Sequence, residues 1–198
     1  IVDALPKKLV TGYLYRRILR RLRDDTLKDL AQWAMVPRRL VPELLAAILH
    51  VTKEESDRLF ATLRSELTLL EGDTVLTVRA DLRNTLLPLL EAEDAARVRE
   101  IDTIAADFWT QRAPNGEAAA AEAVYHALRI GDTTRAQQLW RNGLARYLGG
   151  YAMEELPEES QAWIEGRLSR ESADQATEEL VASGDVLKAA ATLRAQPQ

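Results

Sequence analysis

The sequence predicts a mainly helical protein: a winged-helix-like N-terminal part with one β-hairpin, followed by tetratricopeptide-like helical hairpins. Three observations predict this fold class. Glycine and proline are scarce, 9 and 7 among 198 residues, which disfavours a turn-rich β fold. β-Branched residues gather around one glycine-containing turn, Glu71-Gly72-Asp73. Elsewhere, apolar residues recur at helical spacing.

The first part of the chain contains four segments with this helical spacing. We expect helices at residues 6–23, 25–34, 42–49 and 53–66. Pro42 suits the first turn of the third helix, where its missing N–H would be unpaired anyway. Thr52 and Glu55 have the spacing of a capping box, in which each side chain satisfies the other residue's backbone N–H at the start of the fourth helix.

The strand signal follows this fourth helix. Leu67–Leu70 and Thr74–Val78 flank the Glu71-Gly72-Asp73 turn and predict an antiparallel hairpin. A hairpin after three helices, the last two short and close together, is typical of a winged helix. A further helix at residues 81–90 completes this part.

Residues beyond 91 give only helical signals. We expect helices at 94–112, 117–130, 133–148, 158–169 and 173–183, and a last one from Val186. The pairs Gly131-Asp132 and Gly184-Asp185 occupy matching places in two similar segments, with glycine ending one helix and aspartate capping the next. We therefore divide the chain into a linking helix (1–24), a winged-helix-like domain (25–91) and a helical-hairpin domain (92–198).

Composition excludes several classes of site. Cysteine is absent, so there is no disulfide, thiolate zinc site or cysteine nucleophile. No stretch approaches the roughly 20 apolar residues of a membrane span. We expect a cytoplasmic protein without membrane association. Because the chain begins with Ile1 and not with Met, we also expect it to be part of a longer protein.

The sequence lacks the motifs of several common chemical sites. No phosphate-binding loop motif occurs. His50 and His126 lie far apart in the sequence; we expect His50 in the last turn of a helix and His126 packed beside Tyr125. Paired carboxylates are expected on solvated helix faces and in first turns: Glu54-Glu55, Glu154-Glu155 and Glu158-Glu159. We therefore predict no enzyme activity and no catalytic, cofactor-binding or metal-binding residue.

Positive charge is concentrated near the N-terminus, although the formal net charge is −5. A partner's acidic face or a phosphate could be contacted by a basic stripe of five residues: Arg16, Arg17, Arg20, Arg21 and Arg23. A solvated helix face is the alternative for this stripe. The recognition helix of a DNA-binding winged helix would begin at Lys53, but the acidic run Glu54–Asp57 would meet the phosphates unfavourably. Nucleic acid is therefore an unlikely partner.

The order of these elements resembles a known family. The run from Leu5 to Leu19, followed by a winged helix and helical hairpins, resembles the region after the nucleotide-binding domain of bacterial STAND-type signal-transduction ATPases. In that family the winged helix often carries a Met-His-Asp motif, and Val78–Leu82 lies at the corresponding place. Asp81 matches the acidic residue, whereas Ala80 replaces the histidine that reads the nucleotide's phosphate.

The resemblance implies a function in bacterial signalling. We expect a non-catalytic regulatory and protein-interaction module that docks on an ATPase domain of the same protein or of another protein. The alternative is a winged-helix nucleic-acid-binding regulator with a helical oligomerisation tail. The two differ in where positive charge is needed, because a DNA binder requires it on the 53–66 helix and the 71–73 turn.

Overall fold

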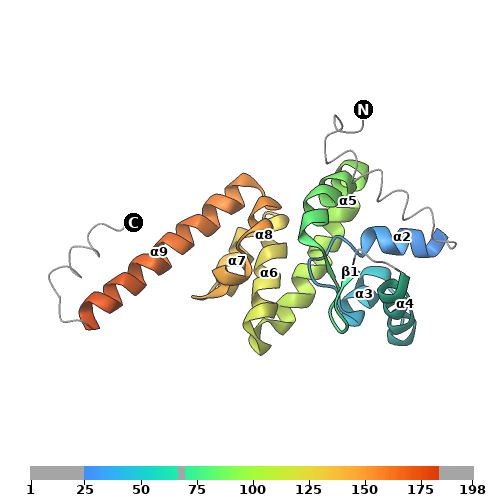
Figure 1. Cartoon of the computed structure of the whole chain (residues 1–198), viewed down its shortest axis with the longest axis horizontal. Coiled ribbons are helices and arrows are strands. Elements are labelled where there is room, and N and C mark those ends of the chain that lie inside the picture. Colours follow the sequence, from blue (N-terminus) through green and yellow to red (C-terminus); the bar gives the residue numbers. More distant parts are fainter. Residues whose placement is uncertain (1–24, 67–69, 183–198) are drawn as a thin grey trace.

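The computed structural model describes residues 25–66 and 70–182, and it is mainly helical with one small antiparallel sheet. The predicted linking helix, the basic stripe and the Gly184-Asp185 turn lie outside these residues. Figure 1 shows α2, α3 and α4 at one end of an elongated molecule, α5 and α6 in the middle, and α9 reaching away at the other end. Among the described residues, none of the helices has both the length and the apolar character needed to cross a bilayer.

Three helices open the described chain, at the places the sequence predicts: α2 (Asp25–Trp33), α3 (Pro42–Leu49) and α4 (Lys53–Glu66). Pro42 occupies the first position of α3, and His50 ends it in the left-handed conformation, with φ 56°. Only half of the predicted capping box forms. Thr52 Oγ1 accepts from the N–H of Glu55 at 3.3 Å, while the Glu55 carboxylate binds Arg58.

The predicted hairpin is present, and its second strand is shorter than expected; residues 67–69 of the predicted first strand lie outside the described residues. Strands β1 (Leu70–Glu71) and β2 (Thr77–Val78) are antiparallel, with Leu70 opposite Val78. Gly72 turns the chain with φ 109°, and a Cβ there would lie 2.1 Å from the carbonyl oxygen of Val75, so only glycine fits. Leu40, between α2 and α3, pairs with Leu76 through two backbone hydrogen bonds and so attaches this loop to the hairpin.

The long helix α5 (Ala80–Arg112) contains the break that the sequence predicts at its middle. Asp94 has non-helical angles, φ −151° and ψ 85°, and its side chain accepts from the N–H of Arg97 at 2.9 Å. Asp94 therefore caps the second half of α5, although no loop separates the halves. Both halves contribute to the first apolar core, which extends from Leu30 to Trp109 and also includes Ala123. The proposed domain boundary at residue 91 stays a prediction.

The C-terminal part begins with the short 3-10 helix η2 (Ala113–Asn115) and continues with α6 (Glu117–Arg129), α7 (Thr133–Leu139), η3 (Leu144–Tyr147), α8 (Tyr151–Glu154) and α9 (Glu158–Ala182). Helix α6 is buried on all sides between α5 and the following elements, and its small alanine residues permit this close packing. The second apolar core is built around it, from Ala113 to Ile164.

Three predicted helices in this part differ from the structure. The expected 133–148 helix ends at Leu139, because Trp140 is extended and its indole N–H is held by Glu171 at 3.1 Å. Gly143, with φ 87°, then starts η3. The expected pair at 158–169 and 173–183 is instead the single helix α9. Neither glycine nor proline interrupts residues 170–172, and the Ser169 hydroxyl donates back to the carbonyl of Glu165, so nothing stops the helix there.

Candidate functional site

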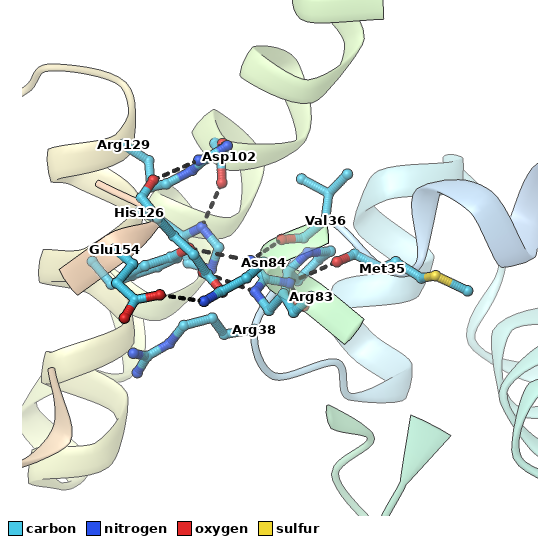
Figure 2. A network of polar contacts seen from close by, with 12 residues as sticks. Met35, Val36, Arg38, Arg83, Asn84, Asp102, His126, Arg129 and Glu154 are labelled. Carbon is cyan, nitrogen blue, oxygen red and sulfur yellow. Dashed lines mark hydrogen bonds and ion pairs between the residues drawn. The ribbon is translucent and has the colours of Figure 1, made fainter. Parts of the chain in front are cut away.

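Arg83, in the first turns of α5, is the centre of a buried polar network. Its side chain is only 5% exposed. The guanidinium has five N–H groups, and each has an acceptor. Three are the carbonyls of Met35, Val36 and Pro37, at 2.6, 2.7 and 3.1 Å. Figure 2 shows Arg83 directed at Met35 and Val36, at the end of α2.

The three carbonyls need a donor because of the local sequence. They lie beyond the last residue of α2, and buried backbone carbonyls need a hydrogen-bond donor. Helix α2 ends at Trp33, and Pro37 lacks an N–H and disfavours continued helix in the residue before it. Arg83 supplies the missing donors from α5, 46 to 48 residues away in the sequence. The chain after α2 is therefore fixed to α5.

The other two N–H groups of Arg83 reach into the C-terminal part. One donates to the Tyr125 hydroxyl of α6 at 3.2 Å, and the other pairs with the Glu155 carboxylate at 2.9 Å. The Tyr125 hydroxyl itself donates to Glu155. Burial raises the pKa of Tyr125 above its ordinary range, so the phenol stays protonated and can donate. Burial opposes the charge of Arg83, but Tyr125 and Glu155 outweigh it and raise its pKa.

The position of Glu155 differs from the prediction for the Glu154-Glu155 pair. The Glu154-Glu155 pair was expected on a solvated face, but the Glu155 side chain is only 4% exposed. Glu154 remains exposed and accepts from the Asn84 amide at 2.6 Å. Adjacent residues at the end of a helix point in different directions. This is why one acid of the pair is in solvent and the other is in the network.

A second arginine attaches the loop after α2 to α6. Arg38 binds both carboxylate oxygens of Glu122, at 2.6 and 3.3 Å, and donates to the carbonyl of Tyr147. Its guanidinium also lies over the Tyr125 ring, 4.5 Å from the centroid. Glu122 and Tyr125 are one turn apart on α6, so a single arginine contacts both.

The network continues along α6 to the second half of α5. Asp102 accepts from His126 Nδ1 at 2.8 Å and from Arg129 at 3.0 and 3.1 Å. Burial alone would raise the pKa of Asp102, but the hydrogen bond from His126 and the charge of Arg129 lower it below its ordinary value. Arg129 also binds Glu91 at 2.7 Å and the carbonyl of Glu155 at 3.0 Å. Figure 2 shows Arg129 and His126 both directed at Asp102.

We call this set the junction network: Arg38, Arg83, Asp102, Glu122, Tyr125, His126, Arg129 and Glu155. It joins the loop after α2, both halves of α5, α6 and the end of α8. Each of its cations is matched by a buried carboxylate, which offsets the large cost of burying charge. Such a network holds elements in one arrangement.

The predicted site residues fall partly within the described chain. The basic stripe of Arg16, Arg17, Arg20, Arg21 and Arg23 lies outside it, as do Gly184 and Asp185. Gly131 has φ 80°, and the Asp132 side chain accepts from the N–H of Arg135 at 2.9 Å, which confirms the geometry predicted for this turn. The internal repeat stays a prediction.

The histidines are where the sequence places them. His126 is fully buried and edge-on to the Tyr125 ring, with centroids 4.9 Å apart, and His50 is exposed at the end of α3. Within residues 25–66 and 70–182, no cluster of three or more histidine and acidic side chains could hold a metal ion.

The charged members of the junction network were not anticipated. One signal was available for Arg83, because it lies among Leu82, Leu86 and Leu87 on the face of its helix that was expected to be apolar. A charged residue on an apolar helix face requires a buried partner. Its partners are 30 or more residues away, and no spacing rule identifies them.

Comparison with known protein families, with curated proteins and with solved structures finds no match.

Proposed function

We propose that the chain is a non-catalytic regulatory and protein-interaction module, and that it follows the nucleotide-binding domain of a larger STAND-type signalling ATPase. One observation carries the interaction role: the junction network fixes the α2–β2 region to α6 and α8 through paired, buried charges. A module that passes a signal between an ATPase domain on one side and a partner on the other needs such a rigid connection. The link to ATPases rests on the resemblance.

The arrangement of the N-terminal elements supports a winged helix. The chain runs through α2, the extended Leu40, α3, α4 and the β1–β2 hairpin, and Leu40 pairs with Leu76 at the hairpin's edge. Three helices with a small antiparallel sheet in this order are typical of a winged helix. The turn at Gly72 corresponds to the wing.

The charges of α4 favour a protein partner over the nucleic-acid alternative. Each of the three cations that a DNA-binding helix would use is already close to a carboxylate. Lys53 binds Asp57 at 2.7 Å, Arg58 binds Glu55, and Arg64 lies 3.9 Å from Asp73 in the hairpin turn. A phosphate would have to compete with these carboxylates and would face their negative charge.

Two binding measurements test the alternatives. Fluorescence anisotropy with labelled duplex DNA should show weak binding that disappears as salt approaches physiological concentration. Affinity in the nanomolar range at that salt, with discrimination between sequences, would support the nucleic-acid regulator instead. Calorimetric titration with ATP and Mg²⁺ should show no binding by this chain alone, and micromolar binding would overturn the non-catalytic assignment.

A third experiment tests the ATPase context. The sequence immediately upstream of Ile1 should encode a phosphate-binding loop and its acidic partner strand. If it does, ATP hydrolysis by the whole protein should change when Arg83 is replaced by methionine, because the rigid connection is lost. An upstream region without a nucleotide-binding domain would overturn the assignment to a STAND-type protein and leave the interaction role open to other partners.

A further inference from the structure

Arg39, in the loop between α2 and α3, is a partly buried cation without a protein partner among residues 25–66 and 70–182. The other arginines of these residues that are at least partly buried do have partners. Each has a hydrogen bond, an ion pair or an aromatic ring beside its guanidinium: Arg38, Arg83, Arg97, Arg112, Arg129, Arg135 and Arg167. Burial of a charge costs free energy unless a partner compensates it. The N–H donors of Arg39 are therefore available to a group that is not part of the described chain.

Arg39 lines a cleft of about 300 Å³ where the N-terminal and C-terminal parts meet. Thr77 and Val78 of β2 line the cleft from the N-terminal part. Gly149 and Ala152, just before and within α8, line it from the C-terminal part. This volume is at the lower end of the range of small-ligand sites, about 300–1,000 Å³. A small ligand in the cleft would therefore contact both parts of the molecule.

The charges around this cleft leave a positive excess at Arg39. Three arginines and two glutamates line it. Arg38 binds both carboxylate oxygens of Glu122, and Arg83 pairs with Glu155 at 2.9 Å. Each glutamate is thus matched by an arginine of the protein itself. Arg39 is the remaining cation, and an anion that enters the cleft can bind it.

The chemistry of Arg39 defines the group that would bind. A guanidinium is planar and presents its N–H groups as a fork that matches two oxygens of a carboxylate or a phosphate. The Thr77 hydroxyl lines the same cleft, and its hydrogen bond to the carbonyl of Glu71 is long, at 3.4 Å. This hydroxyl can therefore turn and donate to the same oxyanion. A neutral or cationic ligand would leave the charge of Arg39 uncompensated.

We propose that this cleft binds a small ligand through a phosphate or carboxylate group, and that Arg39 holds the oxyanion. One arginine and one hydroxyl hold it, so the expected Kd is on the order of 1 mM. The bound ligand contacts the N-terminal and C-terminal parts together, so it stabilises the arrangement that the junction network holds. A role of this ligand in signalling rests on the proposed function, whereas oxyanion binding itself does not.

NMR titration of the nitrogen-labelled chain with inorganic phosphate tests the proposal. The Arg39 Nε–H signal and the backbone N–H signals of Thr77 and Gly149 should shift along one saturating curve. Arg39→Gln removes the charge and the fork, so it should weaken this binding at least about tenfold. Because Arg39 has no partner within the described chain, the variant should fold with an unchanged urea midpoint in chloride. Thr77 and Gly149 shifts that saturate equally in the Arg39→Gln chain would overturn the proposal.

Urea denaturation in phosphate and in chloride of equal ionic strength adds a second measurement. Phosphate also stabilises folded proteins in general, and this effect should be the same in all variants. The midpoint of the unsubstituted chain should therefore rise more in phosphate than that of Arg39→Gln. Arg58→Gln is the matched control, because Arg58 is an exposed arginine of α4 that does not line the cleft, and it should keep the full rise. An equal rise in all three chains would mean that no site at Arg39 binds phosphate.

Succinate, which has two carboxylates and no phosphate, identifies the class of ligand in the same NMR titration. Saturating shifts with phosphate alone would support the site and assign it to a phosphate group. Saturating shifts with succinate alone would support the site and assign it to a carboxylate. If neither anion produces saturating shifts at Arg39, the proposal is wrong.

These outcomes are distinguishable from failure of the proposed function. The absence of oxyanion binding would remove the site and leave the interaction role standing. Oxyanion binding by a chain whose upstream sequence encodes no ATPase domain would leave the site standing and remove the ATPase context.

Discussion

Arg83 and Glu155 are 72 residues apart in the sequence and form an ion pair of 2.9 Å, with side chains only 5% and 4% exposed. Exposed ion pairs contribute little to stability, because water and salt screen them. A buried pair differs, because removing one partner leaves the other charge without compensation in a medium of low polarity. This pair therefore makes folding of the N-terminal and C-terminal parts depend on one another.

Replacing Arg83 with methionine should destabilise the protein strongly. The methionine chain is of similar length but leaves the Met35, Val36 and Pro37 carbonyls and the Glu155 carboxylate without their donor. The expected loss is about 3–5 kcal/mol in the free energy of unfolding, measured by urea denaturation.

Arg64→Met is the matched control, since Arg64 is half exposed and its nearest carboxylate lies 3.9 Å away. It should leave the midpoint almost unchanged. Similar losses in the two variants would mean that the junction network does not stabilise the fold.

Tyr125→Phe should remove the hydroxyl of the network and keep the ring under Arg38. The hydroxyl accepts from Arg83 and donates to Glu155. Its loss therefore leaves one N–H of Arg83 without an acceptor and one carboxylate oxygen of Glu155 without this donor. The expected cost is about 1–3 kcal/mol, less than for Arg83→Met because the other four acceptors of Arg83 remain. Tyr147→Phe, at an exposed tyrosine, should cost much less in the same denaturation assay. A stable Tyr125→Phe chain would indicate that water replaces the hydroxyl.

Asp102 should make the free energy of unfolding decrease at low pH. Its pKa is lowered in the folded chain, whereas an unfolded aspartate titrates near about 3.9. A carboxylate with a lowered folded-state pKa contributes stability that is fully present above the unfolded pKa and is lost as pH falls through the folded pKa. Urea midpoints measured from about pH 6 downwards should therefore fall as the chain passes below about pH 4.

Asp102→Asn should lose part of this acid dependence and be less stable near neutral pH, since His126 and Arg129 lose the negative charge of Asp102. Asp107→Asn offers a control, because Asp107 lies on the same helix but is exposed and pairs with Arg135 at the surface. Its pH profile should match that of the unsubstituted chain. An unchanged dependence of the urea midpoint on pH in the Asp102→Asn chain would show that other acidic residues cause the loss of stability at low pH.

Helix positions in the N-terminal part were largely predictable because they depend on local signals. Pro42, the hairpin glycine Gly72 and the aspartate caps act over a few residues, and the structure places helix ends and the turn near each of them. The sequence predicts Asp94 at the start of a separate helix. In the structure Asp94 caps the second half of α5, and no loop precedes it.

The sequence-based predictions fail where contacts between residues far apart in the sequence determine the structure. The 133–148 segment has helical spacing, yet Trp140 leaves the helix because Glu171, 31 residues later, binds its indole. The junction network depends in the same way on partners that only the fold brings together. Glu155 is the clearest case, since nothing in the sequence near it distinguishes the buried acid from its exposed neighbour Glu154.

The Gly131-Asp132 turn gives the last prediction, because its two residues stabilise the chain by different means. Gly131 has φ 80°, and a Cβ there would meet no atom within 4 Å, so Gly131→Val should cost only the backbone strain of a left-handed β-branched residue, on the order of 1–2 kcal/mol. Asp132→Ala removes the cap at the N–H of Arg135 and should cost about 1 kcal/mol. Gly166, inside α9, also has open space around its Cβ position but has no left-handed conformation, so Gly166→Ala should raise stability by about 0.5–1 kcal/mol. Chemical denaturation followed by circular dichroism should show lower midpoints for the first two variants, a higher one for the third, and an unchanged helical signal before the transition in all of them. A Gly131→Val chain as stable as the unsubstituted protein would mean that this turn can rearrange, and the paired arrangement of α6 and α7 would then not depend on it.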